Sequence, residues 1–239
     1  MTELITHLDE IEKPVPELIA QFGACRSYKA PNGTTITVLP TADLQLANLV
    51  EGNWDTSQSI ERGHFRSVVE VKKLIDGSPA EIFVKSPERT FSGSNPDRLW
   101  WGGPRSGEKL FRLEDPLVEE QVEWETAILI TLVRNQVRAE TPQAILENKG
   151  VKRLIVRAIP STIGSQICKG PSQISIQTRI RELGLRDVDF TFSANAFSDN
   201  EGYTHVIDVN RWDWPGQIDR FRVSLRTKLI QAISQRRIF

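Results

Sequence analysis

Two residues in the last quarter of the chain carry side chains that could hold a hard metal ion. Asn195 and Asp208 stand 13 residues apart (208 − 195), on either side of a predicted hairpin. Amide and carboxylate oxygens suit Mg²⁺, especially where the ion also binds phosphate groups. Residues of these two types also cap turns very often. The pair alone therefore leaves a metal site and a structural role both open.

Other kinds of site find little support in the residue types. The two cysteines, Cys25 and Cys168, lie far apart, and neither has a Cys or His neighbour at the spacing of metal ligands. This spacing argues against a disulfide framework and against a zinc site. The three histidines do not assemble with any specificity into a Ser-His-Asp or Cys-His arrangement. Hydrolase chemistry is therefore unsupported.

The composition excludes few partners. Among 239 residues, 30 Lys and Arg balance 31 Asp and Glu, so the formal net charge is −1. Nothing in this balance demands nucleic acid or an anionic membrane. The segment Met1 to Leu18 lacks the basic and apolar regions of a signal peptide, and no apolar run approaches the roughly 20 residues that span a bilayer. We expect a cytoplasmic protein without a transmembrane segment.

The first half of the chain predicts strands with one long helix. Apolar residues at helical spacing predict a short helix within residues 1–24, before Pro14 and Pro16. Thr34 to Pro40 is rich in β-branched residues and predicts a strand. The next elements are a hairpin over 67–86 with an Asp-Gly turn, a long polar insertion over 87–116, and the clearest helix, over 117–136.

The second half of the chain alternates between predicted hairpins and helices. A hairpin is expected around Asn148 to Gly150, a helix over Ser172 to Leu185, a hairpin over Ala196 to Val209, and a basic amphipathic helix over Ile218 to Arg237. The order hairpin, helix, hairpin, helix, hairpin, helix predicts an α+β protein. Trp212 and Trp214, beside Asp208, are interpreted as structural residues that fill space.

The segment IERGHFRSVVEV resembles the glycine-rich loop of protein kinases. Gly63 falls on the middle glycine and Val68 on the valine that covers adenine, while His64 could touch a phosphate. The outer glycine positions hold Glu61 and Arg66 instead. A Cβ at these positions restricts the loop and the approach of its N–H groups to phosphates.

Three further segments extend the resemblance. EIFVKS resembles the strand that carries the kinase lysine, so Lys85 would pair with the α- and β-phosphates. WETAIL resembles the helix whose glutamate holds this lysine, which makes Glu125 the candidate, with Glu120 and Glu123 as neighbours that could replace it. KRLIVRAIP resembles the strand leading into the hinge between the lobes. Backbone groups from Arg157 to Ile159 would there meet adenine.

SANAFSDNEGYTHVIDVN resembles the catalytic-loop asparagine, the following hairpin and the metal-binding aspartate of the same family. The resemblance makes Asn195 and Asp208 the Mg²⁺ ligands. The family places its catalytic aspartate five residues before the asparagine, where this chain has Phe190, and Asp189 lies one residue further away. Either the loop carries an extra residue and Asp189 is the base, or the base is absent.

The resemblance is to the protein-kinase-like superfamily and implies a two-lobed α+β fold. Only 29 residues follow Asn210 (239 − 210), so the C-lobe would be shortened, as in small atypical and lipopolysaccharide kinases. The expected organisation is an N-terminal extension over 1–52, a kinase-like N-lobe over 53–160 and a reduced C-lobe over 161–239.

The function that the resemblance implies is an ATP- and Mg²⁺-dependent phosphotransferase acting on a small-molecule or glycolipid hydroxyl. Lys85 and Glu125 would orient the phosphates, and Asp189 would accept the hydroxyl proton. The alternative is a catalytically impaired pseudokinase that serves as a nucleotide-binding or protein-interaction module. A third interpretation is an α+β domain that binds a protein partner through exposed Trp100 and Trp101. The sequence leaves open the phosphoryl acceptor, the oligomeric state and the roles of residues 1–52 and 87–116.

Overall fold

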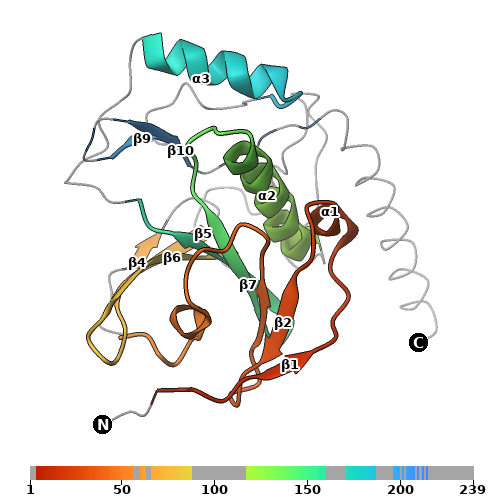
Figure 1. The fold of residues 1–239 in the computed structure, drawn as a ribbon, viewed down its shortest axis with the longest axis vertical. Helices are drawn as coiled ribbons and strands as arrows, with labels where there is room; N and C mark the ends of the chain where they lie inside the picture. Colours follow the sequence, from red (N-terminus) through yellow and green to blue (C-terminus); the bar gives the residue numbers. More distant parts are fainter. Residues whose placement is uncertain are drawn as a thin grey trace, which may run out of the picture.

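The computed structural model describes residues 4–55, 60–62, 66–87, 117–159, 171–186, 196–199, 201, 203–207, 209, 212 and 214. An antiparallel sheet of eight strands forms the body of this part (Figure 1). In spatial order its strands are β1 (Asp9–Ile11), β2 (Arg26–Lys29), β3 (Thr35–Val38), β7 (Pro142–Asn148), β8 (Val151–Arg157), β6 (Pro79–Pro87), β5 (Arg66–Lys73) and β4 (Ile60–Arg62).

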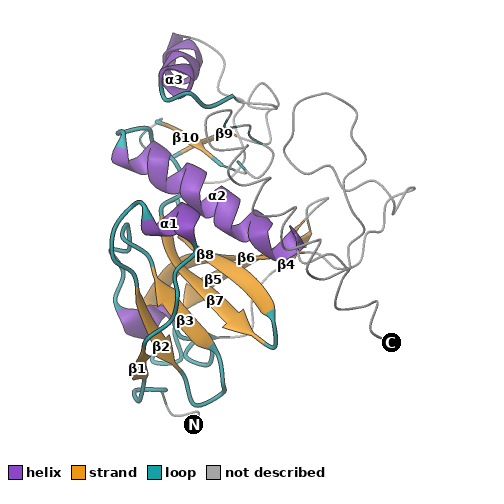
Figure 2. Cartoon of the chain, turned by 90° about the vertical axis from the view of Figure 1, so that its right-hand side faces the viewer, coloured by secondary structure: helices purple, strands orange, loops and turns teal. Residues whose placement is uncertain are grey.

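One long helix covers the sheet. Figure 2 shows α2 (Leu117–Arg134) lying across one face, with the short helix α1 (Glu17–Ala20) beside it. The hairpin of β9 (Ala196–Ser198) and β10 (Thr204–Val206) lies beyond α2, and α3 (Pro171–Glu182) lies farther out. A short 3₁₀ helix, η1, spans Leu46–Leu49. None of the described helices is long and apolar enough to cross a membrane.

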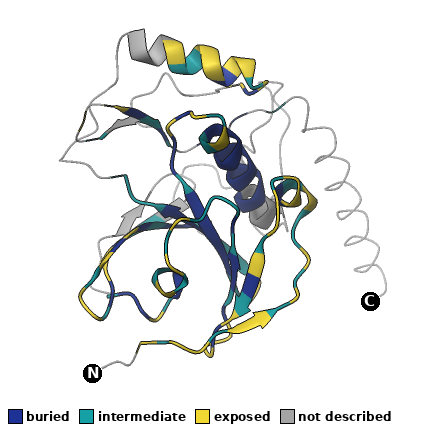
Figure 3. Cartoon of the chain, viewed as in Figure 1, coloured by how far each residue is buried: buried dark blue, intermediate teal, exposed yellow. Residues whose placement is uncertain are grey.

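Side chains of the central strands alternate between two hydrophobic cores, because successive residues of a strand point to opposite faces. Leu154 of β8 packs in the core that contains α2, whereas Ile155 packs in the core on the opposite face. Val84 of β6 belongs to the opposite core as well. Its neighbour Lys85 therefore faces α2. Figure 3 shows that the described side chains of α2 are almost all buried.

The predicted hairpin turns are present and have local causes. Between β5 and β6, Asp76 Oδ1 accepts hydrogen bonds from the backbone N–H of Ser78 at 2.8 Å and from its hydroxyl at 2.6 Å, and Gly77 has φ +85°. Between β7 and β8, Lys149 and Gly150 have φ of +50° and +74°. Two consecutive positive φ values match the right-handed twist of the strands that they join.

The expected helix within residues 1–24 is wrong for most of that segment. Residues 9–11 form β1 instead, and among the described residues 4–24 only α1 is helical. The backbone before β1 also finds a distant partner, because Ile5 N–H donates to Asn53 Oδ1 at 2.6 Å and Ile5 C=O accepts from Asn53 Nδ2 at 3.1 Å. A segment this short, broken by prolines, gains more from such pairing than from an isolated helix.

The first 52 residues extend the main sheet. Strand β3 pairs with β7 along its whole length, so β1, β2 and β3 continue the sheet built by the later strands. The α+β content and the antiparallel sheet agree with the expected fold class. The boundaries of the expected lobes and the shortened C-lobe stay predictions.

Candidate functional site

Lys85 and Glu125 meet between the sheet and α2. The ammonium of Lys85 donates to Glu125 Oε1 at 3.2 Å. The two side chains are 6% and 0% exposed, so solvent screens the pair very little. The structure thus brings together the lysine and the glutamate that the sequence singled out.

The surrounding elements explain why the two side chains meet. Lys85 stands opposite Val68 on β5 and Leu154 on β8, so it lies on an inner strand of the sheet. Glu125 lies one helical turn before two buried apolar residues, Ile128 and Leu129, on a helix packed against that sheet face. A carboxylate in such surroundings requires a cation, because an unpaired buried charge is very costly.

Glu123 has a different partner on the same helix. Its Oε1 accepts a hydrogen bond from the ammonium of Lys152, on β8, at 2.6 Å. The lysine of this pair is 21% exposed. Of the two neighbours that could replace Glu125, Glu123 thus pairs with Lys152, and the side chain of Glu120 lies outside the described part.

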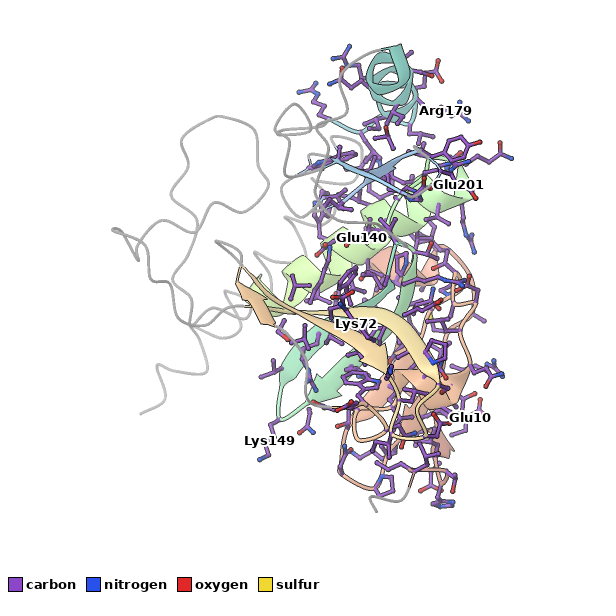
Figure 4. The ribbon with its side chains drawn as sticks, turned by 90° about the vertical axis from the view of Figure 1, so that its left-hand side faces the viewer. Glu10, Lys72, Glu140, Lys149, Arg179 and Glu201 are labelled. Atoms are coloured by element: carbon purple, nitrogen blue, oxygen red, sulfur yellow. The ribbon has the colours of Figure 1, made fainter. Side chains whose placement is uncertain are left out.

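Glu140 is a second carboxylate on Lys85 that the sequence patterns did not reveal. The ammonium of Lys85 also donates to Glu140 Oε2, and the side chain of Glu140 is 6% exposed. Figure 4 shows Glu140 between the β5–β6 strands and the β9–β10 hairpin. The residue lies in the connection from α2 to β7, where neither helical nor strand periodicity applies. Its only signal in the sequence was an acidic residue just before a predicted strand.

The backbone around Glu140 is attached to β10. Glu140 N–H donates to the carbonyl of Val206 at 3.1 Å, and Val206 N–H donates to the carbonyl of Arg138 at 2.8 Å. Ala139 and Val206 thereby form a parallel bridge. This bridge fixes where the side chain of Glu140 begins and directs it towards the sheet.

The expected nucleotide contacts are only partly described. Val68 is partly buried and stands directly across from Lys85, so both side chains lie on the same face of the sheet. At the end of β8, Arg157 N–H donates to Thr141 C=O at 2.9 Å, and Ala158 N–H donates to Glu81 C=O at 2.7 Å. An adenine contact between Arg157 and Ile159 would have to use other backbone groups.

Several predicted residues lie outside the described part. They are Gly63, His64, Trp100, Trp101, Asp189, Phe190, Asn195 and Asp208. In the ranges that are described, no group of three or more His, Cys, Asp or Glu side chains could hold a metal ion. The magnesium ligands and the catalytic base therefore stay predictions. The terminal helix over 218–237 also lies outside these ranges.

The comparisons with known proteins are remote. No protein-family profile matches the chain, and no curated protein matches it in sequence. Among solved structures it is similar to WbdD in a co-crystal with the kinase inhibitor LY294002, at 13% identity and a TM-score of 0.44 over 76% of this chain. It is also similar to the bifunctional kinase-methyltransferase WbdD, at 11% identity and a TM-score of 0.40 over 74% of this chain.

Both neighbours are longer chains than this one. The chain spans 39% and 40% of their lengths. At these TM-scores the likeness carries no argument about fold or activity, so the functional assignment depends on the geometry around Lys85.

Three tryptophans pack together at α2. Trp124 Nε1–H donates to the carbonyl of Trp212 at 3.0 Å, and its ring meets that of Trp214 edge-on at 6.3 Å. Trp212 is fully buried. These contacts agree with a structural role for Trp212 and Trp214, and they attach the chain after β10 to α2.

Proposed function

We propose that this protein is an ATP- and Mg²⁺-dependent phosphotransferase whose acceptor is a hydroxyl group of a small molecule or glycolipid. The observation that supports this function best is the buried ion pair of Lys85 and Glu125 between an inner strand and α2. A buried ion pair seldom stabilises a fold more than apolar residues of equal volume would. A lysine held by a carboxylate on a facing helix is, however, the arrangement with which protein kinases orient nucleotide phosphates.

Two described residues support nucleotide binding at this place. Lys85 supplies an ammonium that Glu125 orients, and Val68 offers an apolar side chain on the same face. Asn195 and Asp208 would hold Mg²⁺, which neutralises charge on the transferring γ-phosphoryl group when it is bound. The carboxylate of Asp189 would accept the proton of the attacking hydroxyl.

Ligand-induced thermal stabilisation tests the binding step. ATP is expected to raise the unfolding temperature of the full chain, and more strongly with Mg²⁺ than without it, because a bound ligand stabilises the folded state. Lys85→Ala and Asp208→Ala should each abolish ATP turnover. If either variant kept normal turnover, the assignment of the site would be wrong.

A catalytically impaired pseudokinase is the second candidate. The observation that favours it is Phe190, which occupies the position where the family has its catalytic aspartate. This function predicts that ATP stabilises the protein while no phosphoryl group is transferred. Comparing wild type with Asp189→Asn decides between the two, because an active enzyme that uses Asp189 as its base would lose turnover and keep ATP binding. The protein partner of such a module and the cytoplasmic location stay predictions.

A further inference from the structure

Lys85 makes ion pairs with two carboxylates. We call Lys85, Glu125 and Glu140 the lysine cluster. A lysine ammonium has three N–H donors, and here two of them are directed at Glu125 Oε1 and Glu140 Oε2. A kinase-like site needs one carboxylate on its lysine, so the second one calls for a separate explanation.

Taken by themselves, the charges of the three cluster side chains disfavour an additional phosphate group. One ammonium and two carboxylates sum to −1 (+1 − 2). All three side chains are 6% exposed or less, so solvent screens these charges weakly. A nucleotide carries several negative charges on its phosphates. An ammonium that is already outweighed by two carboxylates therefore attracts those phosphates less than an ammonium with one partner does.

The two glutamates differ in how firmly the fold holds their side chains. Glu125 lies inside α2, where every described side chain from Val122 to Leu132 is buried. Glu140 lies in an irregular connection, and the contacts of its backbone are with β10 rather than with α2. A rotation of the Glu140 side chain would release Lys85 without moving a helix or breaking the bridge to Val206. Of the two glutamates, Glu140 is thus the one whose side chain starts from a less regular backbone.

We propose that Glu140 and the phosphates of a nucleotide compete for the ammonium of Lys85, so that Glu140 lowers the nucleotide affinity of the site. This inference rests on the proposed nucleotide-binding function. When phosphate oxygens reach Lys85, the ammonium exchanges its hydrogen bond to Glu140 for one to phosphate and keeps its hydrogen bond to Glu125. No covalent bond changes in this exchange.

Isothermal titration calorimetry of the full chain with ATP and Mg²⁺ tests the competition. Glu140→Gln keeps the shape of the side chain and removes one negative charge near the phosphates, so the dissociation constant should fall at least about tenfold. Glu123→Gln is the matched control, because it removes a buried carboxylate whose partner is Lys152. Its affinity for ATP should equal that of wild type.

A second variant covers the case in which Glu140→Gln folds poorly. Glu140→Asp keeps the charge but withdraws it by one methylene, so it should also bind ATP more tightly than wild type, by a smaller factor. If wild type binds ATP and neither variant binds it more tightly, the competition is refuted while the proposed function stands. If wild type and both variants all fail to bind ATP, both proposals fail. Binding by the variants alone would support both.

Discussion

Two groups of ion pairs in the described part of this molecule differ in their exposure to solvent. In the lysine cluster the side chains are 0% to 6% exposed. In the outer pairs, which join the N-terminal segment to β8, Glu51 and Arg153 are 37% and 18% exposed, and Asp43 and Arg157 are 50% and 41% exposed. Both groups connect residues far apart in the sequence, so sequence separation does not distinguish them.

The outer pairs and the lysine cluster differ in what they contribute to the stability of the fold. Solvated ion pairs each contribute little to stability, and the outer pairs add modestly to a segment that β-sheet pairing already holds. The lysine cluster pays a desolvation cost that apolar residues of similar volume would avoid. This cost agrees with the proposal that the ammonium of Lys85 serves a ligand.

The largest expected effect comes from Lys85→Met. The variant leaves the carboxylates of Glu125 and Glu140 buried without their shared cation, which should cost about 3–5 kcal/mol of unfolding free energy. Urea denaturation measures the loss. A triple variant that adds Glu125→Gln and Glu140→Gln should recover most of it. A loss below about 1 kcal/mol would show that the cluster is no more dependent on pairing than the outer pairs.

The second comparison uses two glutamates on one helix. Glu125→Gln should lower ATP turnover more than about tenfold, because Lys85 loses the carboxylate that orients it towards the phosphates. Glu123→Gln should leave turnover unchanged, since its carboxylate binds Lys152. Steady-state kinetics on both variants, each checked for folding by circular dichroism, gives the answer. Equal losses would mean that the two positions act only through the stability of α2.

The pH dependence of stability tests the contribution of one outer pair, Glu51 and Arg153. The hydrogen bonds from Arg153 to Glu51, at 2.7 and 2.5 Å, lower the pKa of this carboxyl below its ordinary value. A carboxyl whose pKa is lower in the folded state adds stability above its unfolded pKa of about 4.3, and loses that contribution as the pH falls through the lower folded pKa.

Glu51→Gln should accordingly cost about 0.5–1 kcal/mol at pH 7, since the pair is partly solvated. The difference from wild type should shrink as the pH falls below about 4. Urea unfolding at a series of pH values measures both quantities. A difference that stayed constant down to pH 3 would show that the Glu51 carboxylate is not the source of the effect.

The smallest effect is expected for Asp43→Asn. Asp43 accepts a hydrogen bond from Arg157 at 2.5 Å, but both side chains are exposed to solvent. The free energy of unfolding, followed by thermal denaturation, should fall by less than about 0.5 kcal/mol. A larger loss would mean that this pair does hold the end of β8, and the contrast with the lysine cluster would weaken.

Local patterns were enough to predict the elements that carry Lys85 and Glu125. Alternating β-branched residues and the Asp76-Gly77 turn defined β5 and β6, and apolar residues three and four apart defined α2. The resemblance to protein kinases then singled out Lys85 and Glu125 on these elements. The two side chains meet because α2 packs on one face of the sheet, and both Lys85 and Glu125 lie on the buried faces of their elements.

Two features were beyond such patterns. Glu140 reaches Lys85 only because the connection before β7 is bridged to Val206, a contact between residues that are 67 positions apart (206 − 139). The segment from Leu4 to Ile11 showed apolar spacing that suits a helix, but its residues 9–11 pair with β2 across a stretch that contains α1. In both cases a distant backbone partner decided the conformation, and local propensity carries no information about it.

The parallel bridge between Ala139 and Val206 also has a consequence for how the molecule opens. The amide hydrogens of Glu140 and Val206 are both donated across it. Neither can be replaced by deuterium from solvent until the β9–β10 hairpin separates from the connection before β7. Exchange at these two amides would therefore report, at a position adjacent to the ammonium of Lys85, how often the small sheet parts from the large one.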